Sequence, residues 1–439
     1  MDAGSDCNAI NAWRMKAHAV IAGMFHFLLV VDDGVKMEYV DGGLDVVTAT
    51  LVFFLGLLLC LFLGKPFQVP VGRSIFLYLW HSIFCLTYAW YVVFDGGDAN
   101  MYYRVSLHHD LVFNVGTAGV IYLTSLFSQG LGLSFLGVFL VYNIIGYVGL
   151  LAFYASLKAA TDGKGFFLKR LALLVVLLPS ASFWSSAIGK DAISFTAIAL
   201  ALWASIHLNK RIILMIVAVL LILLVRPHMA GLIVIGLSAS FVLHANVSYL
   251  KRIGFGCLAL AASSAIVPFA MNYAGIGFGS DVDVVMSYVE ERQAYNQSGG
   301  GGVDISQMNL PMKLFTYMFR PMPFEAGSIF QLASSMDNLI FLYLFIVGGC
   351  AILKGEKSQL GEHRTFLWIY AILAWVILAM TTANLGISVR QKWMFAPVLI
   401  YLFISVMGTM RMPSGVPRVP VQHRPGLHHR DVLQRREGK

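Results

Sequence analysis

Long uncharged runs of apolar residues recur along this 439-residue chain and restrict its fold more than any other feature. Apolar residues make up 58% of the sequence and charged residues only 12%, which is about half the charged fraction of a soluble globular protein. In a bilayer, backbone N–H and C=O groups must bond within their own segment, so a span is a helix of about 20 residues. The sequence therefore predicts an all-α, polytopic transmembrane helical bundle.

Twelve runs are predicted to span the membrane, with both termini on the cytoplasmic side. These runs are residues 17–31, 46–64, 74–94, 133–155, 168–183, 191–208, 212–226, 229–247, 253–272, 329–353, 365–386 and 393–410. The threading gives a single membrane domain, residues 1–410, followed by a basic tail, residues 411–439. We expect the proline-containing tail to be disordered and to lie against anionic lipid headgroups rather than to bind nucleic acid.

In this predicted topology, basic and acidic residues are distributed unequally between the two sides of the membrane. Connectors predicted to be cytoplasmic carry basic pairs such as Lys210 and Arg211, in agreement with the positive-inside rule. Two long outer loops are predicted, at about residues 95–132 and 273–325. The uncharged stretch 111–128 lies in the first loop. As a further span it would reverse the side of every later connector, so it is predicted to be an interfacial or re-entrant helix.

A few basic residues are exceptions to this distribution, because they lie near span ends on the predicted outer face. Such a cation is costly unless it reaches water or an anion. Guanidinium groups bind phosphate in a bidentate manner, and the start of a helix favours an anion. Any one of these residues alone could be an interfacial anchor, but together they predict a site for an anionic ligand. The predicted ligand-binding residues are Lys190, Arg226, His228, Arg320, Arg390 and Lys392.

Carboxylates and aromatic rings accompany these cations on the same predicted face. Asp95 and Asp98 are three residues apart, and their side chains share one side if the preceding helix persists. One could act as a general base, or both could hold a cation. Alternatively, the Asp-Gly sequence only forms the turn that ends the helix. The rings of Tyr102 and Tyr103 are suited to stack on sugars, and Trp184 is predicted either to bind the substrate or to be an aromatic residue of the membrane interface.

Other polar features allow two interpretations each. His81 and Asp337 lie inside predicted spans, where they belong either to a proton path or to hydrogen bonds between helices. The glycine run 299–302 in the second outer loop predicts either a mobile lid or a merely flexible connector. The cysteines show no metal-binding spacing. No cofactor is predicted, and the need for a divalent cation stays open.

Several short motifs resemble those of a known family. They are Pro-Ser-x-x-Phe-Trp-Ser-Ser-x-x-Gly-Lys-Asp at 179–191, Arg-Pro-His at 226–228, Arg-Pro-x-Pro-Phe-Glu at 320–325, and the arginine at 390 just ahead of the last helix. Together they resemble Wzy-type polysaccharide polymerases of bacterial exopolysaccharide and O-antigen loci, which are similar in layout to GT-C glycosyltransferases. The resemblance covers about residues 90–410 and leaves out the tail.

This resemblance implies a glycan donor on undecaprenyl diphosphate and a lipid-linked glycan acceptor at the outer face of the bacterial inner membrane. A polysaccharide chain-length regulator is a possible partner. By position, Arg226, Arg320, Arg390 and Lys190 would bind the diphosphate, and Asp95 or Asp98 would correspond to the loop-one acid of GT-C enzymes. The acidic second outer loop departs from the arginine-rich outer loop of the ligase and polymerase type.

The predicted function is therefore a membrane glycosyltransferase that polymerises undecaprenyl-diphosphate-linked repeat units. The main alternative is a polytopic transporter or a flippase for lipid-linked oligosaccharides, and a third is a noncatalytic assembly partner. Transporters place polar groups near the bilayer midplane and contain internal repeats. In this sequence the polar motifs gather on one predicted face and the two halves show no evident repeat.

Overall fold

The computed structural model describes residues 42–243, 301–305, 307–358 and 363–408, together with scattered residues between 250 and 291. Helices form nearly all of the regular structure in these segments, and their only β-pairing is an isolated bridge between Gly302 and Asn384. The all-α prediction is confirmed. The basic tail, the predicted span 17–31 and most of the predicted span 253–272 lie outside the described residues.

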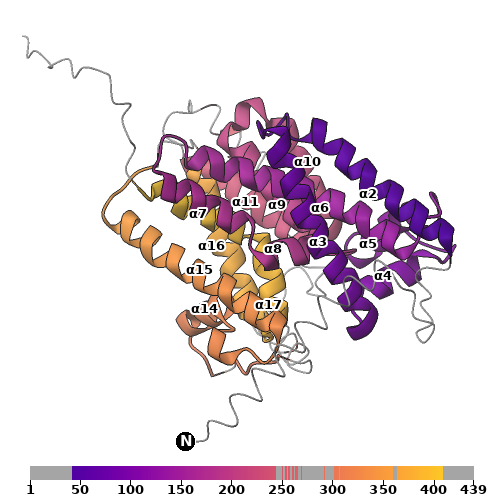
Figure 1. Cartoon of the computed structure of the whole chain (residues 1–439). Coiled ribbons are helices and arrows are strands. Elements are labelled where there is room, and N and C mark those ends of the chain that lie inside the picture. Colours follow the sequence, from indigo (N-terminus) through magenta and orange to yellow (C-terminus); the bar gives the residue numbers. More distant parts are fainter. Residues whose placement is uncertain are drawn as a thin grey trace, which may run out of the picture.

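The elements succeed one another in the following order (Figure 1). They are α2 (Gly43–Leu63), α3 (Val71–Asp95), α4 (Asp98–Ser106), α5 (Thr117–Ser128), α6 (Phe135–Ala160), α7 (Phe166–Val176), α8 (Pro179–Ser185), α9 (Lys190–Ile206), η1 (Leu208–Lys210), α10 (Ile212–Val225), α11 (Pro227–Leu243), α14 (Leu310–Phe319), η2 (Pro323–Glu325), α15 (Ile329–Leu353), α16 (Arg364–Thr381), α17 (Leu385–Gln391), η3 (Lys392–Met394) and α18 (Ala396–Val406).

Six helical segments in the described part of the chain are long and apolar enough to cross a membrane. They are α2, α3, α6, the combined α7 and α8, α15 and α16; a seventh is added if the pair bent by 63° at residues 385–406 is one span. The protein is therefore a helical membrane protein. Twelve spans and cytoplasmic termini remain predictions.

Two predicted spans form helices that are shorter than a typical crossing of about 20 residues. α9 contains 17 residues and α10 contains 14. At about 1.5 Å per residue, α10 extends for about 21 Å, which is less than the hydrocarbon thickness of about 30 Å. We infer that the junction of α10 with α11, at Arg226, lies within the depth of the membrane.

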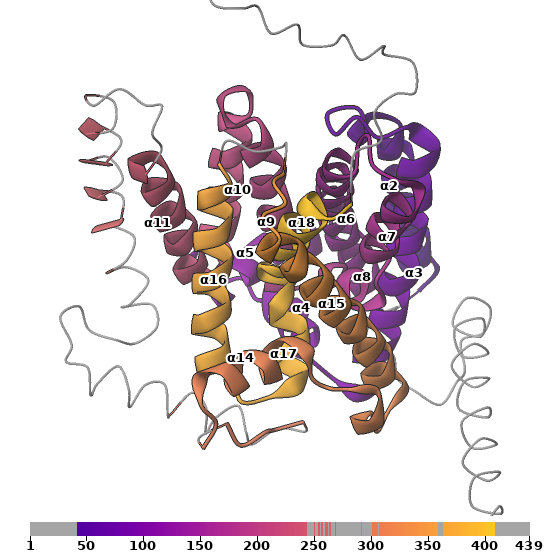
Figure 2. The ribbon, with the colours of Figure 1, turned by 90° about the vertical axis from the view of Figure 1, so that its left-hand side faces the viewer.

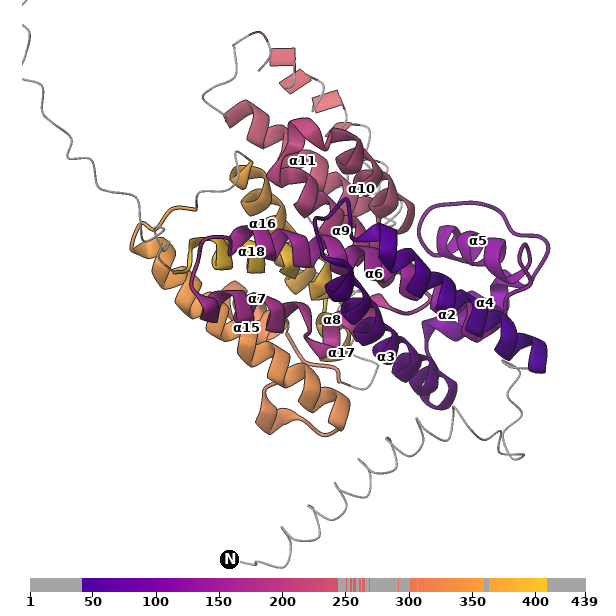
Figure 3. The same cartoon turned by 45° about the horizontal axis from the view of Figure 1, so that its top comes forward.

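Helices α6, α9 and α18 form the centre of the bundle (Figure 3). Every residue of α18 is buried, as is α9 from Ala192 onward. Small residues allow this close packing: a Cβ at Gly149 of α6 would lie 2.7 Å from the Cα of Thr196 in α9. The Thr196 hydroxyl also donates to the carbonyl of Ile145 at 2.8 Å. By contrast, α2 has many exposed apolar side chains, as expected of a lipid-facing helix.

Connectors rich in lysine and arginine meet at one end of this bundle, at the top of Figure 2. Lys158 Nζ, at the end of α6, donates to the carbonyl of Gln68 at 2.8 Å. Arg364 Nη1, at the start of α16, donates to Ser405 Oγ at 2.7 Å. We call this region the basic end and define it by Lys158, Lys164, Arg211 and Arg364. The connectors predicted to share one side of the membrane thus lie together.

The opposite end carries α4, α14 and α17 together with the starts of α9 and α11. We call it the paired end and define it by Asp98, Asp191, Arg226 and Arg390. The first predicted outer loop forms two helices here, α4 and α5. The first helical turn of α5 is attached to α10, because Gly116 N donates to the carbonyl of Leu224 at 2.7 Å. α5 has only 12 residues, too few to cross a membrane.

Candidate functional site at the paired end

The polar motif 179–191 folds into the short helix α8, a turn and the beginning of α9. Pro179 stands in the first turn of α8, where its missing N–H costs nothing. The next N–H, that of Ser180, donates to Asp337 Oδ2 at 2.9 Å. Gly189 has φ 156 in the turn before α9, a value that favours glycine. This turn places Asp191 in the first turn of α9.

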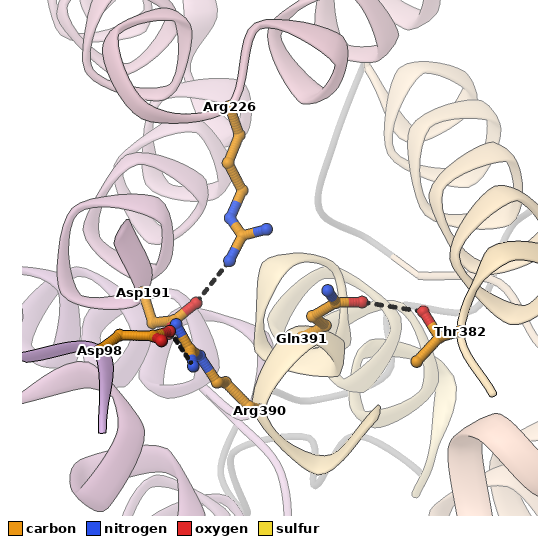
Figure 4. A network of polar contacts seen from close by, with 6 residues as sticks. All are labelled: Asp98, Asp191, Arg226, Thr382, Arg390 and Gln391. Atoms are coloured by element: carbon orange, nitrogen blue, oxygen red, sulfur yellow. Dashed lines mark hydrogen bonds and ion pairs between the residues drawn. The ribbon is translucent and has the colours of Figure 1, made fainter. Parts of the chain in front are cut away.

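Asp191 joins two arginines from distant parts of the chain (Figure 4). Arg226 Nη2 donates to Asp191 Oδ1 at 2.7 Å, and Arg390 Nε donates to Asp191 Oδ2. Arg390 Nη1 also donates to Asp98 Oδ2 at 2.8 Å. The Asp191 side chain is 11% exposed and that of Asp98 is 53% exposed. The cluster therefore runs from a buried carboxylate to one that water reaches.

Two hydrogen bonds fix the segment that carries Arg390. Thr382 Oγ1, at the end of α16, donates to Gln391 Oε1 at 3.0 Å (Figure 4). The side chain of Asn384 caps α17 by accepting from Ile387 N at 3.2 Å. These contacts hold α17 in the orientation that directs Arg390 toward Asp191.

Two buried donors near this cluster have no hydrogen-bond partner among the described residues. They are Arg226 Nε and the hydroxyl of Tyr317 in α14. Tyr317 interacts electrostatically with both Arg226 and Asp191, so it lies close to the cluster. Buried donors are almost always satisfied. An acceptor oxygen from a ligand would satisfy this pair, and Tyr317 is a candidate residue that the sequence did not reveal.

An aromatic wall borders the cluster. The Trp184 ring centroid lies 5.8 Å from Arg390 Cζ. Trp184 packs edge-on against Tyr88 with ring centroids 5.5 Å apart, and Tyr91 packs against Phe330 at 5.1 Å. Trp184, a predicted substrate-binding residue, thus lies beside Arg390. A partly exposed ring next to a guanidinium group offers one face for a sugar and one charge for a phosphate.

Tyr102 and Tyr103, predicted to stack on sugars, lie in the core. Their exposed fractions are 3% and 9%. The Tyr103 hydroxyl donates to the carbonyl of Leu133 at 3.2 Å, and its ring packs against Phe135. Tyr102 lies behind Gly189, where an added Cβ would be 3.5 Å from its ring. Neither ring has an open face for a sugar in this structure.

Only part of the predicted group of cations comes together. Lys190 interacts electrostatically with Arg226, Arg390 and both carboxylates of the cluster. Arg320 instead pairs with Glu325 of its own loop, with Nη2 2.6 Å from Oε1, and this contact holds the pKa of Glu325 below its usual range. Lys392 is fully buried. Its ammonium donates to the carbonyl of Met318 at 3.2 Å and to Asn338 Oδ1.

The acid pair of the first outer loop is divided by a turn. α3 ends at Asp95 and α4 begins at Asp98, with positive φ at Gly96 and Gly97 between them. The helix does not persist, so the condition for the two carboxylates to share a side is not met. Only Asp98 contacts the cluster; Asp95 is exposed. His228 occupies the first turn of α11 and is half-buried.

The two polar groups inside predicted spans make hydrogen bonds between helices. His81 of α3 bonds through Nδ1 to Asn143 Oδ1 of α6 at 2.6 Å and through Nε2 to Ser185 Oγ of α8 at 3.0 Å. Asp337 of α15 accepts from the first turn of α8, as described above. Within the described ranges, no group of three or more His, Cys, Asp or Glu side chains is arranged to hold a metal ion.

Comparison of this chain with protein-family models, with curated proteins and with solved structures finds no match.

Proposed function

We propose that this protein is a membrane glycosyltransferase that polymerises glycan repeat units carried on undecaprenyl diphosphate. The supporting observation is the pair of arginines held by Asp191 beside Trp184. The activity takes place at the outer face of a bacterial inner membrane, with the paired end directed outward. Donor and acceptor are both lipid-linked glycans that reach the site from the bilayer.

The diphosphate binds by exchange with a carboxylate. Asp98 is half exposed, so breaking its ion pair with Arg390 costs about 0–1 kcal/mol. Asp191 is buried between both arginines and stays in place. Phosphate oxygens then accept hydrogen bonds from Arg390 and from the unpartnered Nε of Arg226 and hydroxyl of Tyr317. Lys190 adds a further positive charge.

The same groups serve the chemical step. The acceptor hydroxyl forms a C–O bond to the donor sugar as the bond between that sugar and the diphosphate breaks, and the electron pair leaves on a phosphate oxygen. Preplaced cations stabilise that developing charge, typically the largest catalytic contribution. Asp98, released from Arg390, accepts the proton of the attacking hydroxyl. The Trp184 face orients the donor sugar.

Arginine substitutions test this function. Arg226→Ala and Arg390→Ala are expected to lower polymerisation at least about 100-fold, since each removes a donor to the leaving group. The measurement is the length distribution of glycan formed from undecaprenyl-diphosphate-linked repeat units in proteoliposomes. Lys169 is an exposed lysine of α7, so Lys169→Ala is the matched control. This variant should polymerise normally.

The same assay separates the proposal from transport. Normal product lengths in both arginine variants would refute it, provided that both are present in the membrane at wild-type levels. Movement of the lipid-linked glycan across the bilayer without any new glycosidic bond would identify a flippase instead.

A further inference from the structure

A cavity of about 510 Å³ lies at the basic end, remote from the Asp191 cluster. Its walls come from the connector before α3, the end of α6, the connector to α7, the end of α9, the segment after α15 and the end of α18. Among its lining residues are Phe67, Gln68, Lys158, Asp162, Lys164 and Trp203. Its volume is within the range of about 300–1,000 Å³ that is usual for small-molecule sites.

The cations around this cavity form no ion pair with a carboxylate of the described residues. Lys158 and Lys164 line it, while Arg211 and Arg364 bond to the lining residues Trp203 and Ser405. All ion pairs found in the described part of the chain involve Arg226, Arg320 or Arg390. The four cations at the basic end form none of them.

Backbone carbonyls hold these side chains in place instead. Lys164 Nζ donates to the carbonyls of Ser405 at 2.7 Å, Met407 at 2.8 Å and Ile404 at 3.0 Å, at the end of α18. Arg211 Nη1 donates to the carbonyl of Trp203 at 2.7 Å. The carbonyl end of a helix carries about half a negative charge. These bonds therefore position the cations while leaving the region positively charged.

The two described carboxylates near these cations, Asp162 and Glu356, form no ion pair with them. Asp162 lines the cavity, but its Oδ1 accepts from Gly163 N at 3.0 Å in a local turn. Glu356 interacts electrostatically with Lys164 without forming an ion pair. Among the described residues, Lys158, Lys164 and Asp162 therefore line the cavity, while Arg211 and Arg364 add positive charge next to its lining residues Trp203 and Ser405.

The cavity also has an apolar side. Phe67 and Trp203 pack with ring centroids 6.2 Å apart, and the Arg211 guanidinium lies 3.7 Å from the Trp203 ring centroid. Tryptophan and arginine at a span end are typical of the boundary between lipid tails and headgroups. Cationic pockets between helices at this level suit phosphate headgroups.

We propose that this cavity binds a phosphate-bearing anion, with Lys158 as its cationic ligand and Lys164, which is held by three carbonyls, as a fixed positive charge beside it. This site is independent of the proposed glycosyl transfer. The anion comes either from the headgroup of an anionic phospholipid or from a free phosphate in solution. In both cases it supplies a counter-ion to cations that form no ion pair among the described residues.

The test uses the full chain in nanodiscs of phosphatidylcholine, with and without phosphatidylglycerol. Bound lipid is counted by native mass spectrometry, and the thermal unfolding midpoint is measured in parallel. The wild type is expected to retain phosphatidylglycerol and to unfold at a higher temperature in its presence. Lys158→Gln should bind it about fivefold more weakly, because it removes one cation close to the headgroup.

Lys169→Gln is the matched control, since it removes the same charge from an exposed position on α7 outside the cavity. It should bind phosphatidylglycerol as the wild type does. Lys158 makes only one hydrogen bond to backbone, so its substitution is compatible with folding. Equal binding by the wild type and Lys158→Gln, or equal losses in Lys158→Gln and Lys169→Gln, would overturn the proposal.

A second arm identifies the source of the phosphate. Inorganic phosphate is titrated against the protein in pure phosphatidylcholine nanodiscs. Stabilisation that depends on Lys158 in this arm indicates a free phosphate. Stabilisation only by phosphatidylglycerol indicates a lipid headgroup, and no Lys158-dependent effect in either arm refutes the site.

Discussion

The two ends of this bundle both carry cations, but they hold them by different means. At the paired end, Arg226 and Arg390 bond to carboxylates that are 35 and 199 residues away in sequence and meet on Asp191. At the basic end, Lys164 and Arg211 bond to main-chain carbonyls at the ends of helices. A carboxylate can be exchanged for another anion, whereas a carbonyl remains part of the helix. The difference separates a site suited to ligand exchange from one that anchors helix ends and keeps its positive charge.

The largest expected effect comes from breaking the buried pair. Asp191→Asn leaves two guanidinium groups without their shared counter-charge, so we expect a loss of about 3–5 kcal/mol in the free energy of unfolding. Chemical unfolding in detergent micelles measures it. Asp162→Asn at the basic end is the matched control, because an amide oxygen can still accept from Gly163 N. Similar losses in both variants would remove the distinction between the two ends.

A smaller effect is expected from the carbonyl-bound lysine. Lys164→Met removes a charged donor to three carbonyls, and a loss of about 1.5–3 kcal/mol is expected. Hydrogen exchange of the last turn of α18 should increase at the same time. Lys169→Met, on the exposed side of α7, should change neither quantity. Unaltered exchange in Lys164→Met would show that these bonds do not hold the helix end.

The exposed carboxylate of the paired end, Asp98, is expected to contribute strongly to activity but little to stability. Asp98→Asn should change the free energy of unfolding by only about 0–1 kcal/mol, because the Asp98 side chain is half exposed. Because Asp98 is the proposed base, this substitution should lower the polymerisation rate about 100-fold or more. Asp95→Asn should polymerise normally, since Asp95 does not contact the cluster. Full activity in the double variant would exclude both Asp95 and Asp98 as the base.

The smallest effect concerns the partly exposed pair of Arg320 and Glu325. The Arg320 guanidinium lowers the pKa of Glu325, so the stabilisation is fully present above about pH 4.3. It is lost as the pH falls through the lowered pKa. Glu325→Gln should therefore unfold slightly more easily than the wild type at pH 7, with the difference vanishing in acid. A difference that persists at pH 2 would show a contribution other than charge.

The sequence predicts the helical membrane fold well where the length of an apolar run decides the outcome. The run 329–353 coincides with α15, because nothing interrupts it and Ser328 caps its start. The runs 191–208 and 212–226 match the bounds of α9 and α10 to within two residues, although both helices are shorter than a typical span of about 20 residues. Gly189 and the Arg226-Pro227 junction mark their ends at the paired end.

The candidate site is predicted only in part. Arg226, Arg390 and Asp98 stand out in the sequence as charges at the ends of apolar runs. The central role of Asp191 does not, because it depends on which distant side chains the fold brings together. Lys392 resembles a ligand-binding cation in the sequence, but Asn338 and a carbonyl satisfy it inside the core. Tyr317 gives no sequence signal beyond its place one helical turn before Arg320.

The shortness of α10 has an electrical consequence. Because the helix is 14 residues long, we expect the voltage across the membrane to fall partly over the space between the Arg226 guanidinium and the solution at the paired end. A full elementary charge moved across 100 mV changes its energy by about 2.3 kcal/mol. An anion that reaches this depth crosses a fraction of that drop, so its occupancy should vary with membrane voltage.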